Sequence, residues 1–351
     1  MAIAIRSFAK INIGLCIGPR RADGFHELGT VYQTISLQDT IRVDIGRGTG
    51  IEIRSKDPRV PQDESNTCWR VAERVMRSLK QRGRVVIAID KQLPVQGGLG
   101  AASSNGVATM LGIERALKQA LAPEERLRIA AEVGSDLPLF LVGGTVLGTG
   151  RGERVWPIDD LPPVDVVIVT PDEGVSTPEA FRDWDEQFGA VRGFDAVTSG
   201  LTAEDTSGRI QTFSQAAFVW LAGSLPRSLE RGFSGHSAAG VPVLPEESSS
   251  GGKNGGRAET LLLDLVRAGI ENDFERVVFP KHPKLREAKR ALEREGAKYA
   301  SLSGSGSTLY GLFETSAQAE EAARRLNEAG LSAVAARTVS RRQYWQELLN
   351  F

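Results

Sequence analysis

A short glycine-rich run is the part of this sequence best suited to chemistry. It reads Leu93-Pro-Val-Gln-Gly-Gly-Leu-Gly-Ala-Ala-Ser-Ser104 and follows an apolar, β-branched stretch at residues 85–90. After the run, residues 107–117 repeat apolar side chains at helical spacing. A glycine loop that enters a helix offers free backbone N–H groups and the positive end of the helix dipole to an anion. We therefore expect this run to bind a nucleotide phosphate.

The spacing of the glycines excludes two well-known phosphate loops. A Walker loop ends in Gly-Lys-Ser/Thr, and no lysine follows these glycines. A Rossmann fingerprint needs a third glycine where this chain has Ser103. The pattern that remains is Pro-x-x-x-Gly-Leu-Gly-x-x-Ser-Ser, and a plain structural turn is its alternative interpretation.

Composition and charge narrow the class of protein. The chain has 351 residues, enough for two domains, and its 43 basic residues nearly balance 44 acidic ones. That balance argues against a partner such as nucleic acid or a membrane surface. No apolar run approaches the ~18 residues of a membrane span, and Arg6 and Lys10 interrupt any signal sequence, so we expect a cytoplasmic protein. Cys16 and Cys68 lie far apart and predict buried apolar residues rather than a disulfide or zinc site.

The elements that must position the glycine run alternate between strands and helices. Apolar and polar residues alternate at positions 10–17, which predicts a strand with Lys10 and Asn12 side by side on its polar face. Further strands are predicted at residues 30–37, 40–45 and 164–169, with a glycine-rich pair of strands at residues 143–153. Helices are predicted at residues 66–80 and 123–133. Residues 298–339 show the order strand, glycine turn, strand, helix, strand, which is typical of an α+β sandwich.

Composition also divides the chain. A proline cluster at residues 157–163 indicates a boundary between domains of residues 1–162 and 163–351. Within the second domain, residues 190–258 include a tract rich in glycine and serine that cannot bury enough apolar surface to offset its chain entropy. We expect a mobile insertion there.

Four regions of the chain resemble the GHMP small-molecule kinases. They are Phe8-Ala-Lys-Ile-Asn-Ile-Gly-Leu with Arg21-Ala-Asp-Gly-Phe-His-Glu-Leu, the glycine run, Gly134-Ser-Asp-Leu-Pro-Leu-Phe with Gly150-Arg-Gly-Glu153, and Leu302-Ser-Gly-Ser-Gly-Ser-Thr-Leu-Tyr. The resemblance covers nearly all of residues 5–160 and, more loosely, 164–180 and 260–340. It implies a two-domain α+β fold, with a ribosomal protein S5-like N-terminal domain and a ferredoxin-like C-terminal domain. The first region is most similar to family members that use ATP to phosphorylate the 2-hydroxyl of 4-diphosphocytidyl-2-C-methyl-D-erythritol in the non-mevalonate isoprenoid pathway.

The resemblance implies two catalytic residues. Asp136 would be the base or orienting group for the acceptor hydroxyl, and Lys10 would stabilise the developing negative charge beside it. Without the resemblance, the favoured interpretation of Asp136 is a helix cap and that of Lys10 is a solvated strand residue.

The resemblance also implies a site for ATP and its magnesium. The residues around the phosphates would be Pro94, Gly97, Gly98, Gly100, Ala101, Ala102, Ser103 and Ser104, with Asn66 and Lys91 near the base. The family usually has glycines where this chain has Ala101 and Ala102. Ser103 and Ser104 would touch phosphate or magnesium, or serve only as helix N-caps. Asn66 and Lys91 could instead be solvated surface residues.

The acceptor site implied by the resemblance lies elsewhere in the sequence. Its residues would be Asn12, Phe25, His26, Thr177, Phe181, Gly304 and Ser305. The rings of Phe25 and Phe181 would stack on a cytosine, and His26 would bond the edge of that base. The family usually carries Tyr at the position of Phe25, so stacking would persist with one polar contact fewer. A turn residue tucked into the core is the alternative for Phe25.

Two further functions stay open at this point. One is a GHMP kinase for another small molecule, such as homoserine or mevalonate, although neither substrate has a planar base for the aromatic residues. The other is a non-catalytic nucleotide-binding regulatory homologue, against which the presence of both Lys10 and Asp136 argues. The sequence leaves open whether the protein is a monomer or a homodimer.

Overall fold

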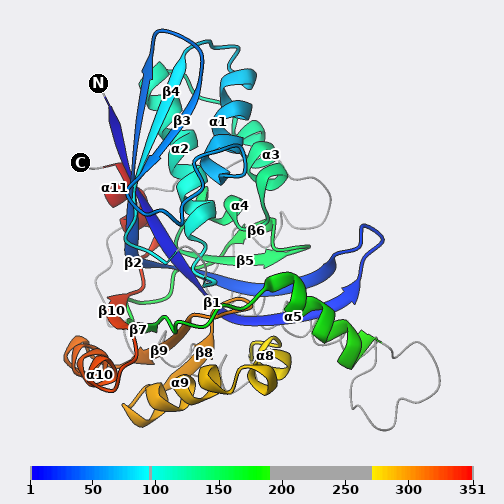
Figure 1. Ribbon diagram of the computed structural model, residues 1–351, viewed down its shortest axis with the longest axis vertical. Coiled ribbons are helices and arrows are strands. Elements are labelled where there is room, and N and C mark those ends of the chain that lie inside the picture. Colours follow the sequence, from blue (N-terminus) through cyan, green and yellow to red (C-terminus); the bar gives the residue numbers. More distant parts are fainter. Residues whose placement is uncertain (1, 95–96, 190–270, 350–351) are drawn as a thin grey trace, which may run out of the picture.

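The computed structural model describes residues 2–94, 97–189 and 271–349. The insertion expected at residues 190–258 lies entirely outside these ranges. The described elements form two β-sheets that meet along the long first strand, with helices on their outer faces (Figure 1). Residues 10–17, predicted as a strand, are the centre of this longer element, β1 (Ile3–Arg20).

The first sheet has six strands and belongs to the N-terminal half of the chain. Its order is β3-β4-β2-β5-β6, with β1 pairing antiparallel to β2. The strands are β2 (His26–Gly46), β3 (Gly50–Ser55), β4 (Arg84–Asp90), β5 (Thr145–Thr149) and β6 (Arg154–Pro157). The two strands predicted at residues 30–37 and 40–45 are one continuous strand, because β2 keeps pairing with β1 past a register shift between Phe8 and Ala9.

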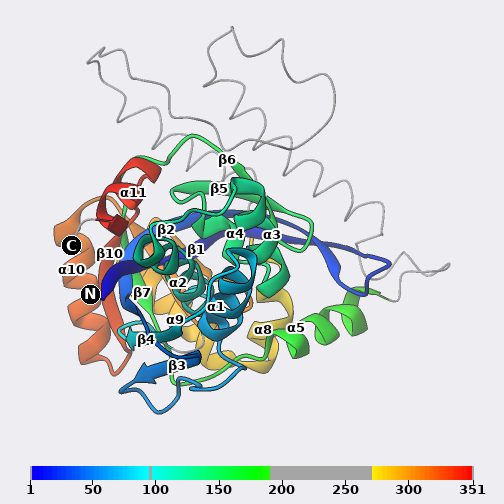
Figure 2. The same ribbon diagram turned by 90° about the horizontal axis from the view of Figure 1, so that it is seen from above.

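Helices cover one face of this sheet, as seen from above in Figure 2. They are α1 (Thr67–Ser78), α2 (Ala101–Leu117), α3 (Pro123–Val133) and the short α4 (Leu137–Phe140). Helix α3 has the bounds predicted from Pro123 at its first turn. Cys68 of α1 is 1% exposed and Cys16 of β1 is 6% exposed, which confirms that both are buried.

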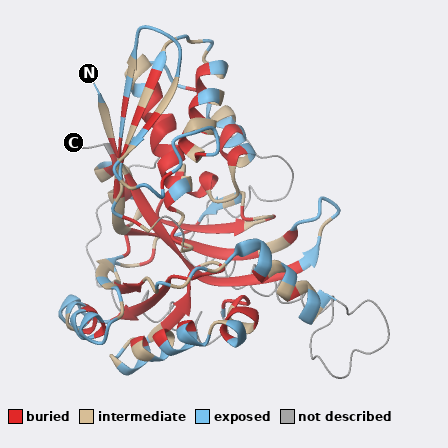
Figure 3. Cartoon of the chain, viewed as in Figure 1, coloured by how far each residue is buried: buried red, intermediate tan, exposed pale blue. Residues whose placement is uncertain are grey.

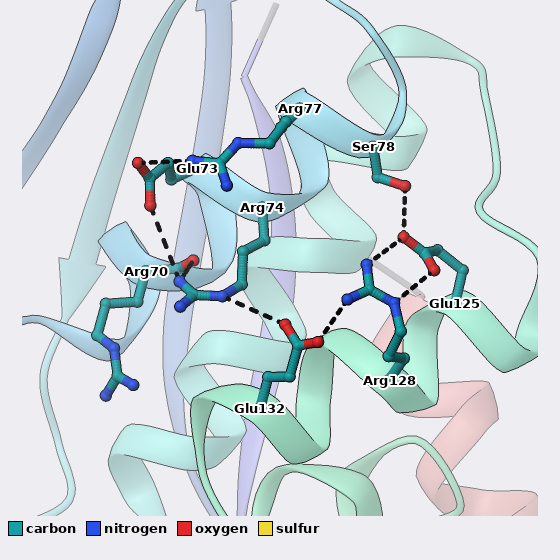
Figure 4. Close-up of polar contacts among 8 residues, drawn as sticks. All are labelled: Arg70, Glu73, Arg74, Arg77, Ser78, Glu125, Arg128 and Glu132. Carbon is teal, nitrogen blue, oxygen red and sulfur yellow. Dashed lines mark hydrogen bonds and ion pairs between the residues drawn. The ribbon is translucent and has the colours of Figure 1, made fainter.

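Ion pairs and a hydrogen bond connect α1 to α3 on the outer surface (Figure 4). Arg74 of α1 lies 3.7 Å from Glu132, which also pairs with Arg128. Ser78 of α1 donates to Glu125 at 2.6 Å. Exposed pairs of this kind each contribute only about 0–1 kcal/mol, so the buried apolar side chains between these helices carry most of the stability.

The second sheet has four strands and an all-antiparallel order, β10-β7-β9-β8. The strands are β7 (Asp165–Val169), β8 (Tyr299–Leu302), β9 (Leu309–Phe313) and β10 (Ala333–Arg337). The helices on this side are α5 (Thr177–Trp184), followed by a π-helical turn at Asp185–Gly189, α8 (Glu275–Lys281), α9 (Pro283–Arg294) and α10 (Ser316–Glu328). In chain order the strands lie 4-1-3-2, which confirms the ferredoxin-like prediction.

The last helix returns to the first sheet. In α11 (Arg341–Leu349), the ring of Tyr344 lies 5.3 Å from that of Phe8 in β1, and its hydroxyl donates to the carbonyl of Phe140. The division at residue 162 remains a prediction. Val339 and α11 lie beyond residue 162 and pack in the first core.

Strand β1 is buried along most of its length because both of its faces are covered (Figure 3). Ile5 and Phe8 belong to the core under α1 and α2, whereas Ile17 belongs to the core of the second sheet. The polar face expected for this strand is therefore buried as well: Lys10 and Asn12 are each 2% exposed. The interpretation of Lys10 as a solvated residue is wrong, because its side chain lies against Gly100 at the start of α2 and beside Asp136.

Candidate active site

The glycine run forms a loop that other parts of the chain hold on two sides. On one side, the backbone N–H of Lys10 in β1 donates to the carbonyl oxygen of Leu99 at 3.0 Å. On the other side, the Ser303 hydroxyl donates to the carbonyl oxygen of Gly98 at 2.9 Å. The turn between β8 and β9 therefore packs directly on the loop.

Glycine is required in this loop because a side chain has no room. At Gly98 φ is +81°, and a Cβ would lie 2.0 Å from the carbonyl oxygen of Ser303. At Gly97 φ is +142°, and a Cβ would lie 2.6 Å from the hydroxyl oxygen of Thr308. The glycines thus allow close approach of the loop to the 303–308 turn.

Helix α2 begins directly after the loop without a side-chain cap. Its N-cap is Gly100, with φ of +67°, and no side chain bonds the first turn. The interpretation of Ser103 and Ser104 as N-caps is therefore wrong, since both lie inside the helix. Ser104 is buried and accepts a hydrogen bond from Ser7 at 2.8 Å, whereas Ser103 is half-buried and Ala102 is exposed. The first N–H groups of α2 have no partner within the helix and face the loop.

A buried carboxylate that the sequence did not single out anchors the loop. Asp39 of β2 is fully buried and accepts hydrogen bonds from the backbone N–H groups of Gln92 and Leu93 at 2.7 and 2.8 Å. It also accepts from Lys91 Nζ at 2.6 Å and from Asn105 of α2 at 3.0 Å. Asp39 thus ties the segment before the loop to the helix after it. A single acidic residue between two other polar residues, Gln38 and Thr40, is a weak signal in the sequence, which explains why Asp39 was missed.

The two predicted catalytic residues lie beside the loop. Lys10 Nζ is 3.5 Å from Oδ2 of Asp136, and a Cβ on Gly100 would lie 3.0 Å from Cγ of Lys10. The Lys10 side chain is 3% exposed and that of Asp136 is 32% exposed. Burial lowers the pKa of Lys10 below its usual value, and the nearby Asp136 carboxylate opposes that shift. Lys10 and Asp136 can therefore place charged groups beside the N-terminus of α2.

Asp136 does precede a helix, but its side chain does not cap it. The residue is the N-cap of α4, and no side-chain hydrogen bond to that helix is formed. Its Oδ1 instead accepts from the hydroxyl of Tyr32 at 3.2 Å. The carboxylate is therefore directed towards Lys10 and Tyr32 rather than into the backbone.

Asn12 of β1, Thr177 of α5 and the turn between β8 and β9 complete this cluster. Lys10 Nζ donates to Oδ1 of Asn12 at 2.5 Å. A Cβ on Gly304 would lie 3.5 Å from that same oxygen, and the hydroxyls of Ser305 and Thr177 are 2.7 Å apart. Six of the predicted positions therefore gather in one place: Lys10, Asn12, Gly98, Gly100, Gly304 and Asp136.

Comparison with known proteins agrees with this geometry. The family model for the GHMP kinases N terminal domain matches residues 66–144, and that for the GHMP kinases C terminal domain matches residues 258–331. A protein of Solibacter usitatus named 4-diphosphocytidyl-2-C-methyl-D-erythritol kinase is 34% identical over 88% of this chain and 80% of its own length. A protein of the same name from Acaryochloris marina is 31% identical over 93% of this chain and 92% of its own length.

The chain belongs to the 4-diphosphocytidyl-2-C-methyl-D-erythritol kinase family of the GHMP kinases. A crystal structure of a 4-(cytidine 5'-diphospho)-2C-methyl-D-erythritol kinase matches 96% of this chain and 99% of its own, with a TM-score of 0.67 and 26% identity. A homoserine kinase from Cytophaga hutchinsonii matches with a TM-score of 0.60 at 17% identity, which shows the shared fold alone.

The aromatic residues of this family member are arranged differently from the sandwich that the resemblance implied. The ring of Phe181 stacks on that of His26, with centroids 5.3 Å apart and planes 9° apart, instead of facing Phe25. His26 is 8% exposed, with Nδ1 2.9 Å from the Gly18 carbonyl and Nε2 3.0 Å from Asp185. Phe25 is 52% exposed under the guanidinium of Arg151, so its interpretation as a core residue is wrong.

Asn66 and Lys91 have structural partners of their own. Asn66 is the N-cap of α1, accepting from the N–H of Cys68 at 2.8 Å and donating to the carbonyl of Pro61 at 2.6 Å. Lys91 pairs with Asp39, and its side chain is 7% exposed. The interpretation of either residue as solvated is wrong. Their predicted place near the nucleotide base stays a prediction.

The loop fits the triphosphate of ATP, which a GHMP kinase uses as phosphate donor. The loop exposes backbone next to the uncapped end of α2, where an anion is favoured. Nearby, the Thr308 hydroxyl is buried and forms no hydrogen bond, so its oxygen can bond a ligand.

Within residues 2–94, 97–189 and 271–349, no three His, Cys, Asp or Glu side chains converge as a metal site. In the same ranges, no helix has the length and apolar character needed to cross a membrane.

Proposed function

We propose that this protein transfers the γ-phosphoryl group of ATP to the 2-hydroxyl of 4-diphosphocytidyl-2-C-methyl-D-erythritol. The observation that carries the proposal is the position of the Lys10–Asp136 pair, 3.5 Å apart and beside Gly100 at the start of α2. The names of the relatives supply the acceptor, since the family is defined by that substrate. We also propose that the reaction takes place in the cytoplasm.

Each residue of the site has a separate role in phosphoryl transfer. ATP supplies the phosphoryl group, and the N–H groups of the loop and of the first turn of α2 hold its phosphates. Asp136 orients the acceptor hydroxyl and takes its proton as the oxygen forms its bond to phosphorus and the bond to ADP breaks. Lys10 stabilises the negative charge that develops on that oxygen. Magnesium would accompany the phosphates, with the Ser103 hydroxyl as a candidate contact.

The acceptor would lie between the two sheets. Asn12, Thr177 and Ser305 supply polar groups on that side of Lys10, and Phe25 supplies an exposed ring at the end of the β1–β2 hairpin. Homoserine and mevalonate have no ring to stack there, which favours the cytidine-bearing substrate. The pairing of Lys10 with Asp136 favours a catalyst over a regulatory homologue.

A coupled ADP-release assay tests the proposal. The wild-type protein is given ATP, magnesium and one acceptor at a time: 4-diphosphocytidyl-2-C-methyl-D-erythritol, homoserine or mevalonate. We expect turnover with the first alone, and a loss of at least ~100-fold in kcat for Asp136→Ala. Asp90→Ala, which removes an exposed carboxylate of β4, serves as the control. Turnover with homoserine or mevalonate alone would overturn the assignment of the acceptor.

A further inference from the structure

A buried tyrosine contacts one oxygen of the Asp136 carboxylate, and Lys10 lies near the other. Tyr32 of β2 is 2% exposed, and its hydroxyl donates to Oδ1 of Asp136 at 3.2 Å. Lys10 Nζ lies 3.5 Å from the other oxygen, Oδ2, and 5.4 Å from the centroid of the Tyr32 ring. Each oxygen of the carboxylate therefore has its own partner.

Two glycines make the room that Tyr32 occupies. A Cβ on Gly148 would lie 2.4 Å from Cε2 of the Tyr32 ring, and a Cβ on Gly152 would lie 2.3 Å from its hydroxyl oxygen. Gly152 also has φ of +99°, and its Cβ would lie 4.0 Å from Oδ1 of Asp136. The turn Gly150-Arg-Gly-Glu153 had no role in the predicted site. In the structure it packs directly against the Tyr32 hydroxyl.

The turn itself is held by carboxylates near the same site. The N–H of Gly150 donates to Glu27 at 3.0 Å, and the N–H of Arg151 donates to Glu153 at 2.6 Å. Burial raises the pKa of Tyr32 well above its usual range, and the negative charges of Asp136 and Glu153 add to that shift. The hydroxyl therefore keeps its proton and acts as a donor towards Asp136.

We propose that Tyr32 is a positioning residue that fixes the rotation of the Asp136 carboxylate, and that Gly148 and Gly152 keep the space this tyrosine needs. The inference rests on the proposed function, because it takes Asp136 as the group that meets the acceptor hydroxyl. Lys10 alone holds one oxygen and leaves the carboxylate free to turn about its last torsion. With Tyr32 on the other oxygen, the plane of the carboxylate is set before substrate arrives.

Removal of the hydroxyl alone tests the inference. In Tyr32→Phe the ring still fills the space beside Gly148, so the fold is kept. We expect kcat to fall by about tenfold while both KM values change less than about twofold, because the hydroxyl acts through Asp136 and not on substrate binding. Tyr344→Phe is the matched control, since its buried hydroxyl donates to a backbone carbonyl in the first core. We expect its kcat to be unchanged.

A double-mutant cycle separates positioning from a general structural effect. In the Asp136→Asn background, Tyr32→Phe should lower the remaining rate by less than about twofold, because the carboxylate it serves is gone. Equal losses in both backgrounds would overturn the inference. Wild-type turnover that Tyr32→Phe leaves unchanged would overturn it while the proposed function stands, whereas an inactive wild-type protein would overturn both.

A second variant approaches the same contact from the turn. Gly152→Ala would push the Tyr32 hydroxyl away, and Gly296→Ala is its control, because Gly296 has φ of +96° with no atom near its Cβ position. We expect Gly152→Ala to lose about tenfold in kcat beyond the control. In the Tyr32→Phe background this extra loss should disappear, because the obstructed atom is absent. Persistence of the full loss there would overturn the role given to Gly152.

Discussion

Lys10 Nζ lies 3.5 Å from Oδ2 of Asp136, yet the two side chains differ greatly in their access to solvent. Lys10 is enclosed, with its side chain 3% exposed beside Gly100 and Gly304, whereas that of Asp136 is 32% exposed. The asymmetry suits a kinase, because the carboxylate can meet an incoming hydroxyl while the ammonium group stays out of water. A charge held in such surroundings acts more strongly than one in solvent.

Removal of the buried ammonium group should abolish turnover. We expect Lys10→Met to lower kcat by about 100-fold or more, because no other described cation lies as near to Asp136. Steady-state ADP release measures the change. Lys298→Met, which removes an exposed lysine paired with Glu314, should leave kcat intact. A Lys10→Met protein with near wild-type kcat would exclude Lys10 from catalysis.

Lys10 should also make stability depend on pH. Burial lowers its pKa in the folded protein below the usual 10.5, so the folded state binds fewer protons than the unfolded chain between those two values. Stability therefore rises with pH across that interval. We expect the free energy of unfolding of wild type to increase relative to that of Lys10→Met as the pH rises towards 10.5. Parallel urea titrations of both proteins check this, and a constant difference would contradict it.

A methyl group on Gly98 should disrupt the phosphate loop. Its Cβ would lie 2.0 Å from the carbonyl oxygen of Ser303, at a φ of +81° that alanine rarely adopts. We expect Gly98→Ala to raise the KM for ATP at least about tenfold and to destabilise the fold by roughly 2–4 kcal/mol. Gly330→Ala, at φ of +84° with no atom near its Cβ position, isolates the cost of backbone strain. The two variants would behave alike if the loop did not depend on this contact.

Asp39 should matter for both folding and nucleotide binding. Asp39→Ala leaves Lys91 buried without its carboxylate and two backbone N–H groups without acceptors. We expect a loss of about 3–5 kcal/mol in the free energy of unfolding. Asp39→Asn keeps one acceptor, and we expect it to fold with a raised KM for ATP and an unchanged KM for the acceptor. Thermal unfolding and separate titrations of the two substrates distinguish these effects.

Phe25 should contribute to binding of the acceptor substrate and not to the stability of the fold. Its side chain is 52% exposed, so Phe25→Ala should leave the midpoint of thermal unfolding nearly unchanged. We expect the KM for the cytidine-bearing acceptor to rise about tenfold, in keeping with the loss of one stacked base, and the KM for ATP to stay constant. Phe25→Tyr would restore the polar group common in the family and should lower the acceptor KM. Equal effects on both substrates would contradict a place in the acceptor site.

Local patterns in the sequence determined several elements of this protein, whereas its site positions were implied by the family resemblance. Alternation in residues 10–17 predicted a strand with Lys10 and Asn12 as neighbours, and the two are 2.5 Å apart at their polar ends. Pro123 and the acidic residues after it predicted where α3 begins. The glycine run predicted a loop leading into a helix. Such features depend on the torsions and spacing of a few consecutive residues, which any chain carries in its sequence.

Only the tertiary structure decided which distant groups meet. Nothing near Tyr32 in sequence indicates that its hydroxyl reaches Asp136, because the contact depends on the space left by Gly148 and Gly152 in another strand and turn. The four hydrogen bonds of Asp39 depend in the same way on the pairing of β2 with β4 and on the packing of α2. The stack of His26 on Phe181 brings α5 to the end of a hairpin. These contacts arise from the packing of whole sheets and helices, and the periodicity of one segment does not encode the position of another.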